Sequence, residues 1–130
     1  MRGATARGSD FSGANLAAIE FTMADLSKAI FKGANLMDAD MSGANMEGAD
    51  LRGTNLRRTN FGPTELRDKD GTPTHRSWPT NLSGANLRSA NLDGANLRKA
   101  KLKGADLHNA RLTNADLFGA QMEDTLIDTG

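Results

Sequence analysis

The chain has 130 residues, with 16 basic and 16 acidic side chains, no cysteine and one tryptophan. This length fits a single domain, and the absence of cysteine excludes disulfides, a thiolate nucleophile and a cysteine zinc site. No run of about 18 apolar residues and no apolar leader is present, so the sequence predicts no membrane span and a cytoplasmic location. The mean hydropathy of −0.52 resembles that of a disordered chain, so the order of the residues has to decide the fold.

A large apolar residue, which we call a centre, recurs at every fifth position. A small residue, most often alanine, lies two positions before the centre, and asparagine or aspartate usually lies between them, as in Ala14-Asn15-Leu16. The first run of centres is Phe11, Leu16, Phe21, Leu26, Phe31, Leu36, Met41, Met46, Leu51, Leu56, Phe61 and Leu66. The second run is Leu82, Leu87, Leu92, Leu97, Leu102, Leu107, Leu112, Leu117, Met122 and Ile127.

This five-residue period fits neither standard element. A helix buries residues three and four apart and a half-buried strand buries alternate residues, whereas a spacing of five forms no stripe on a helix. The pattern is explained if each pentapeptide is one short extended side of a coil. The centre and the small residue two before it then face inward, and glycine, asparagine, serine or aspartate form the corners.

The units Ala34-Asn35-Leu36-Met37-Asp38 and Ala85-Asn86-Leu87-Arg88-Ser89 resemble the A(D/N)LXX repeat of the pentapeptide-repeat family. The resemblance implies an all-β fold, a right-handed quadrilateral parallel β-helix with about five to six coils of four pentapeptides each. We expect one domain over residues 1–130, with repeats over about 9–68 and 80–129. Phe11 and Phe31 should then stack on each other, and Leu26, Met46 and Leu66 should form one column of the core.

The segment 67–79 interrupts the repeats. Leu66 and Leu82 are 16 residues apart, one more than three repeats, and the segment carries two of the three prolines and the only tryptophan. A projecting loop that turns at Asp70-Gly71 is expected. It is either a recognition loop on a rigid scaffold or a tolerated insertion whose Trp78 folds back over a coil edge. The candidate interaction residues are Arg67, Asp68, Lys69, Asp70, His75, Arg76 and Trp78.

The neutral total charge conceals three bands. Residues 10–50 carry a net charge of −5, residues 52–111 carry +7 and residues 112–130 carry −4. The basic middle predicts either a contact surface for an acidic partner or solvated charge that keeps a regular β-rod from aggregating. The residues of the predicted basic ridge are Arg88, Arg98, Lys99, Lys101, Lys103 and Arg111.

The repeats carry no catalytic triad, carboxylate dyad or metal-ligand cluster, so the sequence predicts no enzyme activity, no metal and no cofactor. A structural or protein-interaction module is the favoured function, with another protein as partner and no membrane contact. The apolar C-terminal coil with Met122, Leu126 and Ile127 also predicts end-to-end homodimers.

Two further functions stay open. Some members of the resembled family mimic duplex DNA and bind DNA gyrase or another type II topoisomerase, which yields quinolone resistance and requires a strongly acidic surface. A nucleic-acid binder would instead use the basic middle band, but Trp78 is the only aromatic side chain placed to interleave with it.

Overall fold

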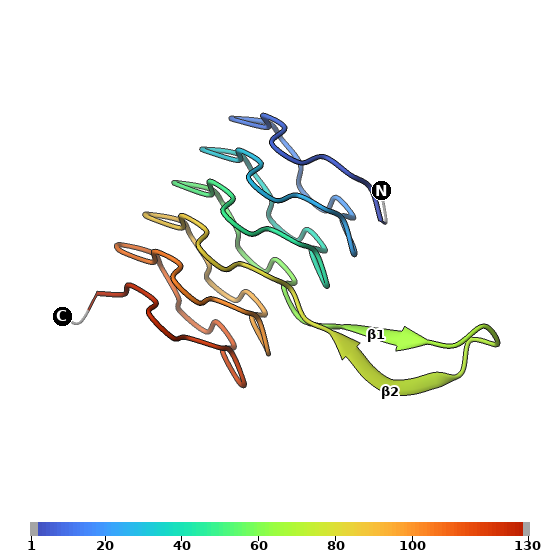
Figure 1. The fold of residues 1–130 in the computed structure, drawn as a ribbon. Helices are drawn as coiled ribbons and strands as arrows, with labels where there is room; N and C mark the ends of the chain where they lie inside the picture. Colours follow the sequence, from blue (N-terminus) through green and yellow to red (C-terminus); the bar gives the residue numbers. More distant parts are fainter. Residues whose placement is uncertain (1–2, 129–130) are drawn as a thin grey trace.

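The structure is a computed structural model that describes residues 3–128. Similar coils are stacked along one axis, with the two ends of the chain at opposite ends of the stack, and a hairpin protrudes from the middle (Figure 1). The hairpin contains the two regular strands of the described residues, β1 (Thr64–Arg67) and β2 (Pro73–Trp78). The coils are held together by single parallel bridges instead of long strands.

The bridges show why the coils stack in register. Except where the hairpin intervenes, each bridge joins the residue before a centre to the residue 20 positions later, as in the column Asn15, Asn35 and Asn55. Along such a column Leu16 N donates to Asn35 O at 2.7 Å, and Asn35 N donates to Ala14 O at 2.9 Å. Neighbouring columns are five residues apart in the sequence, so four pentapeptides complete one coil. The stack is therefore a four-sided parallel β-solenoid.

The core is filled by the centres and the small residues that precede them. Every centre from Phe21 to Leu107 is fully buried except Leu66, and each such side chain contributes about 1.5–3 kcal/mol. The predicted stack of Phe11 on Phe31 is confirmed, with ring centroids 5.0 Å apart and an interplanar angle of 13°. Towards the ends of the stack the centres are only partly buried, and Ile127 is 40% exposed.

Each corner is a tight turn that closes one side and opens the next. The carbonyl of a centre accepts the N–H three residues later, as Phe11 O does from Ala14 N at 3.0 Å. The residue two after the centre takes a positive φ, which is 67° at Gly13 and 59° at Ala18. Glycine adopts this conformation without strain, whereas an L-residue there costs about 1–2 kcal/mol. The abundance of glycine at this position follows from the turn.

Pro63 explains where the hairpin leaves the stack. It stands two residues after Phe61, at the corner position that takes a positive φ elsewhere, and the proline ring fixes φ near −65°. The chain therefore cannot turn there, and it continues outward into β1. It rejoins the stack at Thr80. Bridge partners across the hairpin are 36 residues apart, as in Asn45 and Asn81, instead of 20, so 16 residues are inserted.

The prediction that Leu66 is a core centre is wrong. Leu66 lies half-buried in β1, and Leu82 takes its place in the column after Leu26 and Met46. Both Thr64-Glu65-Leu66 and Thr80-Asn81-Leu82 match the repeat, but the first directly follows Pro63, so no corner can place it in the coil. The inserted segment consequently begins at Thr64, three residues before its predicted start at residue 67.

The hydrogen bonds of the threonine hydroxyls show which of the two matching segments, 64–66 or 80–82, lies in the coil. Thr80 Oγ1 donates to the carbonyl of the centre Met41 at 3.3 Å and accepts from Gly43 N at 2.9 Å. At the same repeat position Thr54 Oγ1 donates to Phe31 O at 2.8 Å. Thr64 Oγ1, in contrast, is buried and has no hydrogen-bond partner among residues 3–128. Thr80 thus makes the contacts that the repeat requires, and Thr64 does not.

Candidate interaction surface

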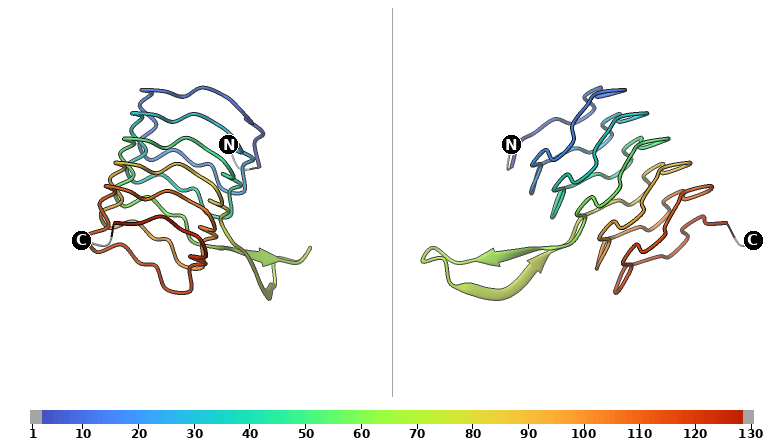
Figure 2. Two further views of the ribbon diagram at one scale, coloured as in Figure 1. Left: turned by 60° about the vertical axis from the view of Figure 1, so that its left-hand side comes forward. Right: turned by 180° about the vertical axis from the view of Figure 1, so that it is seen from behind.

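The hairpin is a short antiparallel ribbon that extends well away from the coils (Figure 2). Thr64 pairs with Trp78, and Glu65 pairs with Ser77. Its tip is organised by Asp68, whose Oδ1 accepts Asp70 N and Thr72 N, both at 2.9 Å. Asp68 O also accepts the N–H of Gly71 at 3.0 Å. The turn at Asp70-Gly71 is therefore where the sequence predicts it.

The hairpin brings the predicted interaction residues onto one projecting element. All seven are exposed: Arg67, Asp68, Lys69, Asp70, His75, Arg76 and Trp78. Trp78 is 53% exposed, and its covered part borders a small hollow of about 160 Å³ beside Asn45, Asn81 and Lys101. The indole thus lies at the base of the hairpin, against the coil edge on one side and open to solvent on the other.

A larger groove of about 580 Å³ lies on the β1 side of the hairpin. We call it the β1 groove; its walls are Glu20, Thr22, Asp40 and Ser42 from the coils and Pro63–Arg67 from the hairpin. Sequence reasoning missed this groove, because Glu20 and Asp40 are ordinary repeat positions more than 20 residues before β1. The signal available was the proline at a corner, which indicates that a segment leaves the stack beside those two residues.

The predicted basic ridge is wrong as a single surface. The four columns of bridges place its residues on four different sides of the stack. Arg88 lies on the Asn86 side, and Arg98 and Lys99 lie on the Asn96 side. Lys101 and Lys103 lie on the Asn81 side, and Arg111 lies on the Asn91 side. Three of them pair with carboxylates of the neighbouring coil: Arg88 with Asp106 at 3.0 Å, Arg98 with Asp116 at 3.1 Å and Arg111 with Asp93 at 2.8 Å. A linear sequence band becomes dispersed because successive repeats face different directions.

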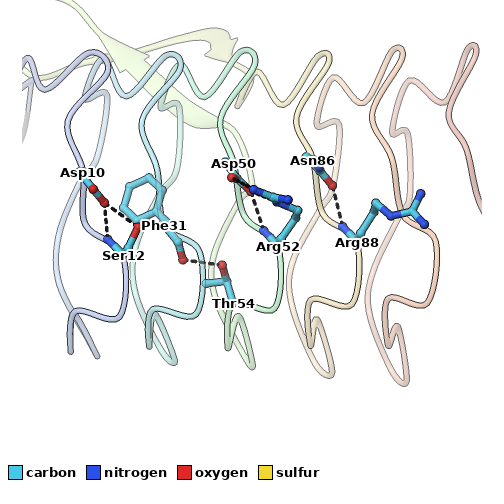
Figure 3. A network of polar contacts seen from close by, with 8 residues as sticks. All are labelled: Asp10, Ser12, Phe31, Asp50, Arg52, Thr54, Asn86 and Arg88. Carbon is cyan, nitrogen blue, oxygen red and sulfur yellow. Dashed lines mark hydrogen bonds and ion pairs between the residues drawn. The ribbon is translucent and has the colours of Figure 1, made fainter.

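One side of the stack shows how its polar side chains are used (Figure 3). The side-chain oxygens of Asp10, Asp50 and Asn86 each accept the backbone N–H two residues later. Arg52 additionally forms a bidentate pair with Asp50, with Nε–Oδ1 at 2.9 Å and Nη2–Oδ2 at 2.7 Å. Lys32, Arg52 and Arg88 border a shallow hollow of about 320 Å³ on this side. Where asparagine or aspartate precedes a centre, its side-chain oxygen therefore supports the corner.

Hydrogen bonds and ion pairs of this kind lower the pKa of several aspartates. The backbone N–H of His108, with the Arg88 and His108 side chains, lowers the pKa of Asp106 to about 2. Hydrogen bonds from Ser12 lower the pKa of Asp10, and the Arg58 guanidinium lowers that of Asp38. These carboxylates are stabilised in their charged form by the folded chain.

Acidification is expected to destabilise the protein between about pH 4 and pH 2. Because the folded-state pKa of Asp106 lies below its unfolded value, the unfolded chain binds protons first as the pH falls. The contribution is fully present above the unfolded pKa and is lost towards about pH 2. Urea midpoints measured across this range should fall with pH, and Asp106→Asn should flatten the slope. An unchanged slope would show that the charged carboxylate contributes nothing to stability.

Residues 3–128 were searched for a membrane-spanning helix and for a cluster of metal-binding side chains. Within this range no helix is long and apolar enough to cross a membrane, and no three histidine, cysteine, aspartate or glutamate side chains gather as a metal site would need.

The fold and its surface define the class as a four-sided β-solenoid of five-residue units with one inserted hairpin. The family described as pentapeptide repeats matches residues 1–33, 19–58, 34–67 and 80–124, in eight copies. The chain therefore belongs to the pentapeptide-repeat family. A search of curated protein sequences finds no match.

Solved structures that are similar to this chain include two pentapeptide-repeat proteins. A pentapeptide-repeat protein from the thylakoid lumen of Arabidopsis thaliana is 32% identical over 88% of this chain and 69% of its own, with a TM-score of 0.75. HetL, a pentapeptide-repeat protein involved in heterocyst differentiation regulation in the cyanobacterium Nostoc, is 28% identical over 98% of this chain, with a TM-score of 0.59. The present chain spans 65% of the length of HetL.

Proposed function

We propose that the protein is a non-enzymatic interaction module in which the coil stack presents the β1–β2 hairpin to another protein. The observation that carries the proposal is the hairpin itself, the departure from an otherwise regular repeat, with Trp78 53% exposed at its base. Tryptophan and arginine are frequent anchors of protein interfaces, and a rigid scaffold that carries an exposed segment is a common arrangement for binding.

Affinity capture from the native host with and without the hairpin tests the proposal. The variant bait lacks residues 64–79 and carries Pro63→Gly, which restores the five-residue spacing between Asn60 and Asn81. A Lys32→Gln bait, changed on the side of the Arg52 and Arg88 column, is the control. Proteins captured by the full chain and by the control should be lost with the hairpin. An unchanged set of partners would contradict the proposal.

The two alternative functions make different demands on the surface. A mimic of duplex DNA needs unpaired acidic groups along the rod, whereas Asp38 and Asp50 are paired with Arg58 and Arg52. Inhibition of gyrase supercoiling by the purified protein would favour the mimic over the hairpin proposal. Salt-sensitive retention of duplex DNA would favour the nucleic-acid binder. The cytoplasmic location and end-to-end pairing stay predictions.

A further inference from the structure

The β1 groove combines an open strand edge with unbalanced charge. β1 belongs to a two-stranded sheet, and within the described part of the chain it pairs with β2 alone, so its other edge has no partner strand there. The groove is lined by Pro63–Arg67 and by no residue of β2, so β1 is the strand of the hairpin that borders it. An unpaired strand edge presents a row of N–H and C=O groups that an extended peptide can complete.

The coil wall of the groove is acidic. Glu20 and Asp40 are bridge partners on neighbouring coils, the single acid–acid pair among the bridges of residues 3–128. Like charges directly opposite each other on adjacent strands destabilise a sheet. In the same range no ion pair joins either carboxylate to a basic side chain, whereas Asp25, Asp50 and Asp106 all have an arginine partner.

The hairpin wall does not neutralise these charges. Glu65 lies in β1, and Arg67 Nη2 is 3.6 Å from its Oε2, so the arginine balances the carboxylate of its own strand. Arg67 Nη1 also donates to Gly71 O at 3.0 Å, which directs the guanidinium towards the tip of the hairpin. The groove therefore retains a net charge of about −2 near the coils, where Glu20 and Asp40 lie.

We infer that the β1 groove binds a short basic segment of a partner protein, in extended conformation, as a third strand beside β1. Backbone groups of β1 would supply the pairing, and Glu20 and Asp40 would receive lysine or arginine side chains of the segment. Half-buried Leu66 in the same strand offers an apolar contact. This inference rests on the proposed function and names the chemistry of the partner.

A synthetic probe tests the charge requirement. The probe is an acetylated, fluorescent six-residue peptide that alternates lysine and valine, and binding is measured by fluorescence anisotropy at low salt. Glu20→Gln with Asp40→Asn should weaken binding about fivefold, the sum of two exposed ion pairs. The matched control is Glu123→Gln with Asp124→Asn, which removes the same charge from the C-terminal coil and should change binding less than about twofold.

A second probe tests the strand pairing. The same peptide methylated on every backbone nitrogen keeps its charge but cannot donate backbone hydrogen bonds, so its binding should be lost. Equal weakening by both double variants, or undiminished binding of the methylated peptide, would overturn the inference. A dimer of this protein that the peptide fails to dissociate would also overturn it, because a second copy would then occupy the groove.

The outcome is separable from that of the proposed function. If the peptide tests fail while removal of the hairpin still abolishes partner capture, the hairpin acts through another surface, such as the β2 side with Trp78. If capture survives hairpin removal, the interaction function of the hairpin itself is wrong. Melting curves of each variant by circular dichroism confirm that it is folded before binding is compared.

Discussion

Truncation of Leu56 to alanine is expected to lower the free energy of unfolding by about 2–5 kcal/mol. Leu56 is fully buried in the middle of the stack, with Leu36 before it and Leu92 after it in the same column. Its neighbours are held by hydrogen-bonded coils, so they cannot collapse into the space left by the missing atoms. Urea denaturation followed by circular dichroism measures the change.

Leu112 supplies the matched control for this prediction. It belongs to the same column but is only partly buried, so Leu112→Ala should cost clearly less than Leu56→Ala. Because each coil contacts chiefly its neighbours, the loss at Leu112 should also be local to the C-terminal coils. Equal losses at the two positions would mean that burial within the stack does not set the contribution of a centre.

Excision of the hairpin is expected to preserve the stack only if Pro63 is also replaced. Removal of residues 64–79 leaves Pro63 directly before Thr80, at a corner where the chain must take a positive φ. Proline cannot adopt that conformation, so the excised chain that keeps it should be less stable by about 3 kcal/mol or more. The excised chain with Pro63→Gly should close the corner and unfold in one transition.

The comparison of the two excised chains needs only thermal or urea melting. Pro63→Gly in the full-length chain is the control for the substitution itself, and its effect should be small because Pro63 there lies in the connection to β1. If both excised chains were equally stable, the positive φ required at the corner would not be the reason why the hairpin leaves the stack.

Much of this fold follows from the sequence because each five-residue unit forms one side of a coil. The spacing of five, the small residue before each centre and the stack of Phe11 on Phe31 depend on side-chain size and turn geometry alone. Leu66 was misplaced because hydrophobic spacing does not distinguish two matching segments. The deciding residue was Pro63, whose effect is on the backbone and not on the hydrophobic pattern.

The candidate site was less accessible to sequence reasoning. The hairpin and its turn at Asp70-Gly71 are local features, so they were predicted. The β1 groove joins Glu20 and Asp40 to a strand that begins at Thr64, and this contact requires both the coil register and the direction in which the hairpin leaves. The basic ridge failed for the same reason, since five residues along the chain correspond to a different side of the rod.

The ion pairs between coils favour the native register in which the coils stack. Coils of nearly identical sequence invite slippage, in which one coil stacks on the wrong neighbour with its leucines still buried. Arg58 meets Asp38 in the coil before it at 2.8 Å, but a shift by one coil would set Arg58 against Ala18 of the same column. The buried side chains are similar in every coil, but the ion pairs differ from coil to coil. Only the native stacking order satisfies them, so the charges favour one register.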